Sequence, residues 1–215
     1  MKMRKSYGKE YLQELFAKIG DSLSEEMTVF LFGGGAMAFR NQKPATKDVD
    51  LILDKERDYA VFTELIKHLG FKEPVEVEIE HKGIKAIDGM WDNPNGFRLD
   101  LFVKHVLHKL ELTEQVKKRS ELLASYGLLE VRMLSNEDVI LFKCMTDRID
   151  DLGDIAAIVR TSSIDWNIIL EECKLQERSK KGGLLLRLLE KLEELKEKQG
   201  IDAPILPQLR KIASQ

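Results

Sequence analysis

Three consecutive glycines, Gly33 to Gly35, stand between a run of β-branched and aromatic residues and a proline. The run, residues 28–32, predicts a buried strand, and the glycines let the backbone approach a ligand or turn sharply after it. Pro44 ends the helical segment that follows, because its ring excludes neighbouring residues from the helical conformation. The helix after the glycines is therefore expected to cover only residues 36–40. The strand at residues 28–32 must therefore be joined to the next element by a very short connection.

Elsewhere the spacing of apolar residues predicts mainly strands in the first part of the chain and mainly helices in the second. Strands are expected at residues 48–53, 75–80, 84–87, 97–103 and 131–134, and helices at residues 7–19, 59–69, 112–125, 135–148, 151–159 and 164–173. After Gly182-Gly183, a leucine seam predicts an amphipathic helix or a short coiled-coil contact, and its members are Leu185, Leu188, Leu192 and Leu195. This order predicts an α+β domain over residues 1–125 and a helical C-terminal region over residues 126–215.

Composition excludes several classes of protein. Lys and Arg number 34 and Asp and Glu number 37, so a net charge of −3 argues against a protein that coats nucleic acid duplexes. Cys144 and Cys173 form no CxxC motif, which excludes a disulfide scaffold and a thiolate zinc cluster. The longest apolar stretch, residues 29–39, is too short for a membrane span of about 20 residues. We expect a soluble cytoplasmic protein with no membrane partner.

Three aspartates carry the most informative pattern. Asp48 and Asp50 begin an apolar strand, and the two-residue period of a strand puts both carboxylates on one face. Adjacent anions repel each other unless a cation separates them, so the pair suits a divalent metal. Asp100 interrupts another core-like run, where an ionised carboxylate must be paired or metal-bound. An ion pair with Arg98, two residues earlier on the same face, is the structural alternative for Asp100.

A dinucleotide-binding site is a competing interpretation. Gly33-x-Gly35-x-x-Ala38 satisfies that fingerprint, and Asp54 lies near the expected position of the ribose-binding acid. The segment before Pro44 is too short for the helix of a parallel crossover. The fingerprint also leaves the paired aspartates unexplained.

Two further alternatives are binding functions that use neither the three aspartates nor a dinucleotide. A non-catalytic module could recognise a partner through the leucine seam. His105 and His108 could share a helix face and bind zinc, but no further ligands cluster near them in the sequence. Glu76, Glu78 and Glu80 also share a face, which indicates a solvated strand surface.

Together the glycines and the acids resemble the nucleotidyltransferase superfamily with the DNA-polymerase-β-like fold. Gly34-Gly35 is followed by twelve residues, then Asp48-Val49-Asp50, then Asp100, as in that signature. The resemblance implies a mixed sheet with flanking helices and transfer of a nucleoside monophosphate from an NTP such as ATP. It further implies that Asp48, Asp50 and Asp100 hold Mg²⁺ or Mn²⁺ and form the catalytic site. Gly34 and Gly35 would contact the phosphates.

A second element resembles AbiEii-like toxins and related minimal nucleotidyltransferases. Lys143 and Arg148 precede Asp151-Leu152 and Asp154-Ile155 in the same order, although Asp150 stands where relatives often have a basic residue. The resemblance implies that Lys143 and Arg148 bind the triphosphate or an RNA backbone. Ordinary helix surface charge, or an ion pair between helices, explains these residues equally well. The acceptor would be a tRNA, a protein or a small molecule, and a role in a toxin–antitoxin pair would add an antitoxin as partner.

Overall fold

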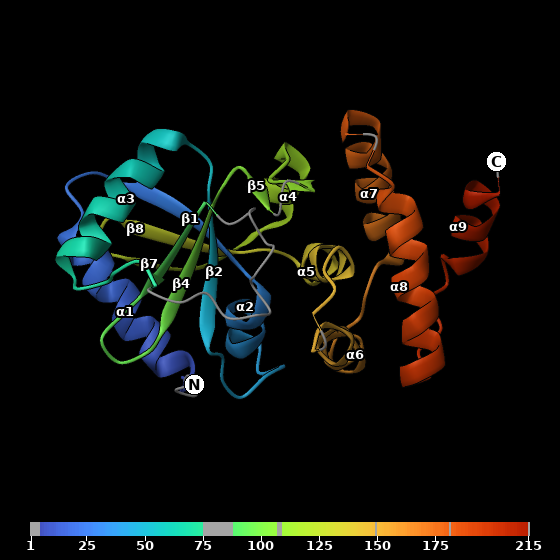
Figure 1. The fold of residues 1–215 in the computed structure, drawn as a ribbon, viewed down its shortest axis with the longest axis horizontal. Coiled ribbons are helices and arrows are strands. Elements are labelled where there is room, and N and C mark those ends of the chain that lie inside the picture. The colour runs from blue at the N-terminus through green and yellow to red at the C-terminus, as the bar shows by residue number, and fades with distance from the viewer. Residues whose placement is uncertain (1–4, 75–87, 107–108, 149, 181, 215) are drawn as a thin grey trace. The chain divides into compact units, whose positions relative to one another are not determined.

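The computed structural model describes residues 5–74, 88–106, 109–148, 150–180 and 182–214. It contains two compact units, which we call the sheet unit (Met1–His108 and Leu112–Leu134) and the helical unit (Lys109–Glu111 and Ser135–Gln215). The predicted α+β class, with a mixed sheet, flanking helices and a helical C-terminal part, is confirmed (Figure 1). The strands predicted at residues 75–80 and 84–87, with the three glutamates on the first, lie outside the described residues.

The described elements of the sheet unit run from α1 to β5 and from α4 to β8. Their bounds are α1 Lys9–Ser22, β1 Met27–Phe32, α2 Gly33–Phe39, β2 Asp48–Leu53, α3 Glu56–His68, β3 Gly89–Asp92, β4 Arg98–Val103, β5 His105–Val106, α4 Glu114–Arg119, β7 Glu121–Tyr126 and β8 Leu129–Met133. The helical unit contains β6 Leu110–Glu111, α5 Asn136–Cys144, α6 Asp151–Thr161, α7 Trp166–Lys180, α8 Leu184–Gln199 and α9 Leu206–Ala213.

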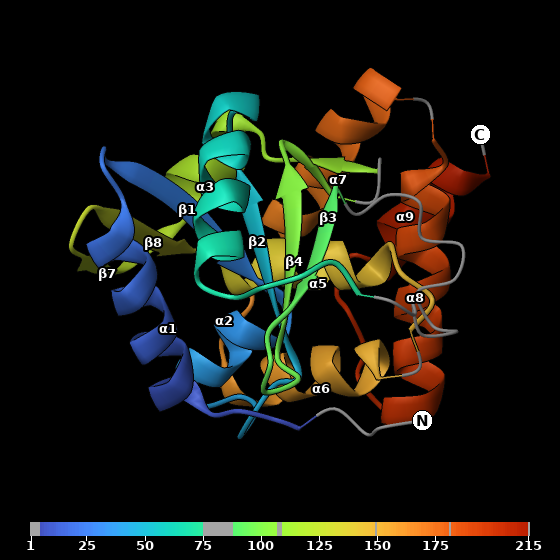
Figure 2. The same cartoon turned by 60° about the vertical axis from the view of Figure 1, so that its left-hand side comes forward.

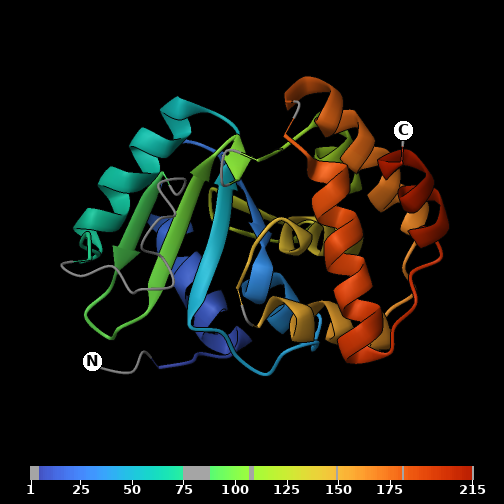
Figure 3. The same cartoon turned by 45° about the vertical axis from the view of Figure 1, so that its right-hand side comes forward.

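Six strands form one mixed sheet in the order β3-β4-β2-β1-β8-β7. The neighbouring strands β2 and β4 are parallel, as are β1 and β8, whereas β1 and β2 are antiparallel. Figure 2 shows β2, β4 and β3 side by side, and the same neighbours can be followed by colour in Figure 3. Because β2 and β4 have a strand on each side, Asp50 and Asp100 each have register partners on two neighbouring strands.

The antiparallel pairing of β1 with β2 excludes the dinucleotide-binding interpretation. In that fold the strands on either side of the glycine turn are parallel and joined by a long crossover helix. Here α2 has 7 residues, so the chain returns beside the strand it has just left. Asp54, the candidate ribose-binding acid, accepts a hydrogen bond from Lys117 Nζ at 2.7 Å. The competing interpretation was therefore wrong.

Helices α1, α2 and α3 pack together on one face of the sheet. That face carries the buried residues Leu31 and Val49, and a Cβ atom added at Gly35 would touch both of their side chains. Successive side chains of a strand point to opposite faces. Asp48, Asp50, Arg98 and Asp100 therefore share the other face, which we call the carboxylate face.

One predicted helix, residues 112–125, is wrong over its second half. The helix α4 ends at Arg119, and the chain then forms β7, which pairs with β8 through a turn at Gly127 (φ 57°). Arg132 on β8 holds the end of α4, donating from Nε to Ser120 Oγ and from Nη2 to Ser120 O, both at 2.9 Å. The expected domain boundary after residue 125 falls inside this hairpin, whereas the compact units divide after Leu134.

Within the helical unit, α8 packs against α5, α6, α7 and α9. Leu188, Leu192 and Leu195 of the predicted seam are buried, with Leu184 in place of the partly exposed Leu185. The seam is therefore covered by its own unit, and Leu186 is the exposed leucine of the helix. The predicted cap is confirmed, because Ser135 Oγ accepts a hydrogen bond from Asp138 N at the start of α5. Among the described residues, none of the helices combines the length and apolar character needed to cross a membrane.

Two glycines, one in α1 and one in α6, give a matched test of how closely a helix packs against its neighbours. A Cβ atom at Gly20 in α1 would lie 1.6 Å from the backbone oxygen of Tyr126, whereas at Gly153 in α6 it would meet nothing within 4 Å. We expect Gly20→Ala to lower the free energy of unfolding by about 3 kcal/mol, through overpacking. Gly153→Ala should raise it by about 0.5 kcal/mol, because alanine favours the helix. Urea denaturation followed by circular dichroism measures both; equal effects would contradict the described contact of α1 with β7.

Candidate active site

The register of β2 and β4 brings the predicted acids together. Asp50 pairs directly with Asp100, so their side chains leave neighbouring strands on the same face, about 4.8 Å apart at the backbone. Asp50 is 5% exposed and Asp100 is 0% exposed. Asp48 stands two residues before Asp50 at the start of β2 and shares that face. Two buried carboxylates at this spacing favour a cation between them.

An apolar edge borders these acids on one side. Phe32, the partner of Asp50 on β1, packs edge-on against Phe102 of β4 with ring centroids 5.5 Å apart. Apolar neighbours exclude water and lower the local dielectric constant, which strengthens the attraction of the acids for a cation.

Gly33 lies directly against Asp50. Its φ is +60°, and a Cβ atom there would stand 2.2 Å from Asp50 Oδ2. Both observations explain why a glycine is needed where β1 turns into α2. Gly34 and Gly35 are buried as well, and Cβ atoms at those positions would press on Thr46 Oγ1 (2.5 Å) and on Leu31 Cδ1 (2.8 Å). The structure thus gives both of these glycines a packing role, and their expected contact with phosphates stays a prediction.

The segment before Asp48 is fixed from the N-terminal side of the chain. Tyr7 N donates to Thr46 O at 2.8 Å, and Thr46 N donates to Tyr7 O at 3.0 Å. Thr46 Oγ1 in turn donates to Asp48 O at 2.9 Å. These contacts set the point at which β2 begins. Sequence reasoning missed Thr46, although a β-branched residue between Pro44 and the acids was a usable signal.

Arg98 pairs with an acid other than the one expected. Its Nε donates to Asp92 Oδ1 at 2.7 Å and its Nη2 donates to Asp92 Oδ2 at 3.0 Å. Asp92 stands on β3, opposite Arg98 in register. Sequence reasoning named Arg98 as a partner for Asp100 and missed Asp92, because β3 was not among the predicted strands.

The donor set of the carboxylate face suits Mg²⁺ or Mn²⁺, which prefer carboxylate oxygens. Within the described part of the chain, no group of three His, Cys, Asp or Glu side chains is gathered closely enough to hold a metal alone. Mg²⁺ usually takes one or two protein carboxylates and completes its shell with waters and substrate phosphates. Asp50 and Asp100 on adjacent strands fit that pattern, with Asp48 on the same face.

The other candidate metal ligands do not form a site in the described residues. His105 lies in β5, and His108 is outside the described residues. Cys144 and Cys173 are free and buried. Burial raises the pKa of both thiols, that of Cys173 to about 12, so both stay protonated at neutral pH.

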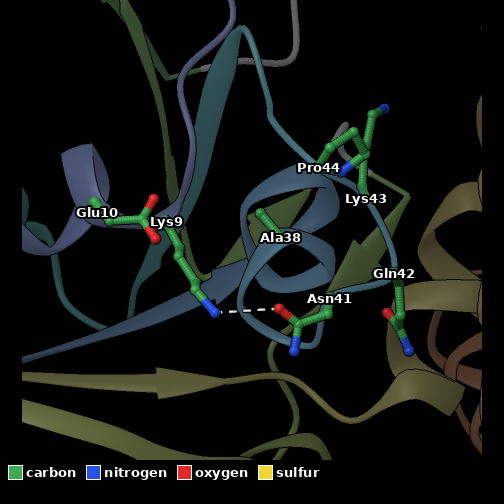
Figure 4. A pocket seen from close by; sticks show the side chains of 7 residues that line it. All are labelled: Lys9, Glu10, Ala38, Asn41, Gln42, Lys43 and Pro44. Carbon is green, nitrogen blue, oxygen red and sulfur yellow. Dashed lines mark hydrogen bonds between the residues drawn. The ribbon is translucent and has the colours of Figure 1, made fainter.

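A pocket of about 270 Å³ lies at the opposite end of α2 from Gly33 (Figure 4). Lys9 Nζ donates to Asn41 Oδ1 across it at 3.1 Å. The pocket is lined by Lys9, Glu10, Ala38, Asn41, Gln42, Lys43 and Pro44. It contains none of the three predicted acids, so we place the candidate active site on the carboxylate face.

Lys143 is held by two carboxylates of the next helix. Its Nζ donates to Asp151 Oδ1 and Asp154 Oδ2, both at 2.8 Å, and Thr146 Oγ1 donates to the second oxygen of Asp151. Burial alone would lower the pKa of Lys143, but the two carboxylates outweigh burial and raise it. Lys143 is therefore charged and joins α5 to α6, and its contact with a nucleotide stays a prediction.

Arg148, the other predicted phosphate ligand, lies in the segment between α5 and α6. Its carbonyl oxygen accepts a hydrogen bond from Asp151 N at 3.2 Å, at the start of α6. Its contact with a nucleotide likewise stays a prediction.

The contact between Gly33 and Asp50 can be tested by substitution. Gly33→Ala should lower the free energy of unfolding by about 2 kcal/mol, because alanine is strained at positive φ and its Cβ displaces the Asp50 carboxylate. Gly35→Ala is the matched control, since its Cβ meets the flexible end of Leu31 and should cost less. Urea denaturation compares the two; an equal or larger loss for Gly35→Ala would contradict the described turn.

The Lys143 cluster predicts a pH dependence. Lys143→Met should lower the free energy of unfolding by about 3 kcal/mol at pH 7, because it removes the cation that pairs with one buried carboxylate, Asp151, and one partly buried carboxylate, Asp154. The raised pKa of Lys143 means that this stabilisation is complete below the ordinary value of 10.5 and is lost as the pH rises through the folded-state pKa. Urea denaturation from pH 7 to 11 measures the difference between wild type and variant.

Lys174→Met is the control for that comparison, because Lys174 forms an ion pair with Glu171, whose side chain is 69% exposed. Its effect should stay below about 0.5 kcal/mol. A Lys143→Met effect as small as this would show that the buried cluster does not stabilise the helical unit.

Comparison with known proteins identifies the family. Residues 10–180 match the family model described as nucleotidyltransferase of unknown function (DUF6036). Among curated proteins there is no match. Two solved structures are similar: lincomycin-bound lincosamide antibiotic adenylyltransferase LnuA (16% identity, TM-score 0.45, 71% of this chain and 95% of that one) and a Thermotoga maritima protein solved as a candidate nucleotidyltransferase (18% identity, TM-score 0.39, 59% and 78%). The family model spans most of the chain and confirms the superfamily expected from the glycines and aspartates. The chain belongs to this nucleotidyltransferase family.

Proposed function

We propose that the chain transfers a nucleoside monophosphate from an NTP in a Mg²⁺-dependent reaction at the carboxylate face. The observation that carries the proposal is the register of β2 and β4, which sets Asp50 opposite Asp100. Gly33 lies against Asp50, so the backbone comes close to the acids. Asp48 and Asp50 would hold the cation, and Asp100 would complete the site. When bound, the cation would neutralise the triphosphate and help to orient its α-phosphorus.

Each residue then has a defined task in the reaction. The acceptor oxygen forms a bond to the α-phosphorus, and the bond from that phosphorus to the pyrophosphate oxygen breaks. Asp100 would take the proton of the attacking hydroxyl, as a general base. Catalysis would depend mainly on positioning and on neutralising charge, since the protein forms no covalent bond to the substrate.

The nucleotide contacts are proposed from the family resemblance and the local structure. Gly34 and Gly35 continue the segment that begins against Asp50, and their backbone would approach the phosphates. Lys143 and Arg148 are proposed to bind the triphosphate or the acceptor. ATP is the NTP we would test first.

The acceptor class separates three versions of the proposal. A tRNA, a protein or a small molecule could supply the attacking hydroxyl. Transfer to tRNA or to a protein of the translation apparatus would favour a toxin whose partner is an antitoxin. Growth arrest on expression of the wild type, absent for Asp50→Asn, would support the toxin role, and normal growth would oppose it.

The direct test is transfer from each α-labelled NTP, with Mg²⁺, to three separate arms: total RNA, cell protein and small-molecule extract. Asp50→Asn should reduce transfer by at least about 100-fold, because it removes one carboxylate from the cation site. The label on the product identifies the acceptor arm. Chelation of the divalent cation should have the same effect as the substitution.

Asp54→Asn is the matched control. Asp54 immediately follows β2 and pairs with Lys117, so its neutralisation removes an equal charge from the same segment but not from the proposed site. Transfer should be unchanged. Undiminished transfer by a correctly folded Asp50→Asn protein would refute the mechanism. An absence of transfer in all three arms would favour a non-catalytic binding module.

A further inference from the structure

Two cations of the helical unit meet at the end of α5. Lys109, which precedes β6, donates from Nζ to Met145 O at 2.7 Å. Arg187 of α8 donates from Nη2 to both carboxylate oxygens of Asp147, at 2.8 and 2.7 Å. The helices α5 and α8 pack against each other within this unit (Figure 1). Because one residue separates Met145 from Asp147, Lys109 and Arg187 both reach the same short segment.

Lys109 is fixed in this place by a buried amide. Two residues after it, Glu111 donates from its backbone N to Gln176 Oε1 at 2.7 Å, and Gln176 Nε2 donates to Glu111 O at 3.2 Å. Gln176 lies on α7 and is 1% exposed. Both backbone groups of Glu111 are therefore held, so the partly buried Lys109 is kept close to Arg187.

The charges at this point are not balanced as they are around Lys143, which has two carboxylates at 2.8 Å. In the described part of the chain, Lys109 donates only to the neutral carbonyl of Met145, and Asp147 is the acid that pairs with Arg187. Burial and, next, the charge of Arg187 lower the pKa of Lys109, and the opposing effect of Asp147 is smaller. Among the described residues, two cations therefore share one acid.

That acid is a weak partner for Arg187. The side chain of Asp147 is 81% exposed, and ion pairs with such an exposed group contribute little. Arg187 is itself 33% exposed and reaches Asp147 with Nη2, so within the described residues its Nε and Nη1 donate to no acceptor. Lys109 likewise uses one of several ammonium donors. An incoming anion would find unused donors on both cations and would displace only an exposed carboxylate.

We propose that Lys109 and Arg187 form a binding site for a terminal phosphate group, such as that of a polyphosphate. A terminal phosphate carries about 1.5 to 2 negative charges at neutral pH, whereas a carboxylate or a phosphodiester of a nucleic acid backbone carries one. Two neighbouring cations with unused donors match the higher charge. The site goes beyond the proposed function, because it needs neither the aspartates of the sheet unit nor a divalent cation.

The test is isothermal titration calorimetry of the full chain with sodium tripolyphosphate, in a buffer without divalent cations. Leaving these cations out keeps the carboxylate face from attracting the probe. Lys109→Met and Arg187→Met should each weaken binding by about tenfold or more, because each removes charge-assisted hydrogen bonds. Asp147→Asn should strengthen binding by about threefold, the equivalent of a surface ion pair, since it removes the carboxylate that competes for Arg187.

Lys198→Met is the matched control. Lys198 also lies on α8 and pairs with an acid, Glu194, at 2.7 Å, so this substitution removes an equal charge from the same helix. It should leave the affinity for tripolyphosphate unchanged. Circular dichroism checks that each variant is folded.

A second measurement needs no substitution. Acetylation of the lysines by an amine-reactive ester, followed by mass spectrometry of the peptides, reports on each lysine separately. Tripolyphosphate should protect Lys109 from acetylation and leave the acetylation of Lys198 unchanged. Equal rates for Lys109 with and without tripolyphosphate would contradict the site.

Several other results would overturn the site. One is the absence of tripolyphosphate binding by the wild type, and another is equal affinity in wild type, Lys109→Met and Arg187→Met. Weaker or unchanged binding in Asp147→Asn is the result expected of a purely structural ion pair. A single-stranded RNA without terminal phosphates that bound as tightly as tripolyphosphate would assign the cations to a nucleic acid backbone instead. Because the titration contains neither NTP nor divalent cation, a failure of nucleotidyl transfer would leave this inference standing.

Discussion

The parallel, in-register pairing of β2 with β4 is the constraint on which the candidate site depends. Backbone hydrogen bonds between these strands fix the separation of Asp50 and Asp100 at one strand spacing, whatever the surrounding side chains do. A shift of one residue would turn one of the two acids to the opposite face. Because β1 and β3 pair with the outer edges of the two strands, neither can slip without breaking a second ladder.

Two carboxylates this close together inside a protein are unfavourable unless their surroundings are adapted to them. Residues next to Asp50 and Asp100 are adapted in this way. Gly33 gives space to the Asp50 carboxylate, and Phe32 and Phe102 close one side with apolar surface. The positive charge nearest in register, Arg98, is engaged by Asp92. The carboxylate face thus carries two buried acids on adjacent strands, a placement that would be unfavourable in a site meant only for packing.

Much of this arrangement was predictable from local patterns. The bounds of β2 follow from its continuous apolar run after the two aspartates, and Pro44 correctly indicated a short α2. Properties that depend on the pairing of distant segments were not predictable. The break after α4 depends on Arg132 holding Ser120, and the partner of Arg98 depends on the register of β3. The local spacing of apolar residues reveals neither the contact of Arg132 with Ser120 nor the register of β3. For this reason residues 121–125 were assigned to a helix.

The compact turn from β1 through α2 to β2 also has an evolutionary consequence. Since the backbone ladder alone sets the distance between the proposed catalytic acids, substitutions in the connecting loops can alter which molecule is recognised without changing that distance. Selection for a new acceptor would therefore act on the periphery of the chain, while the chemistry at its centre is inherited unchanged.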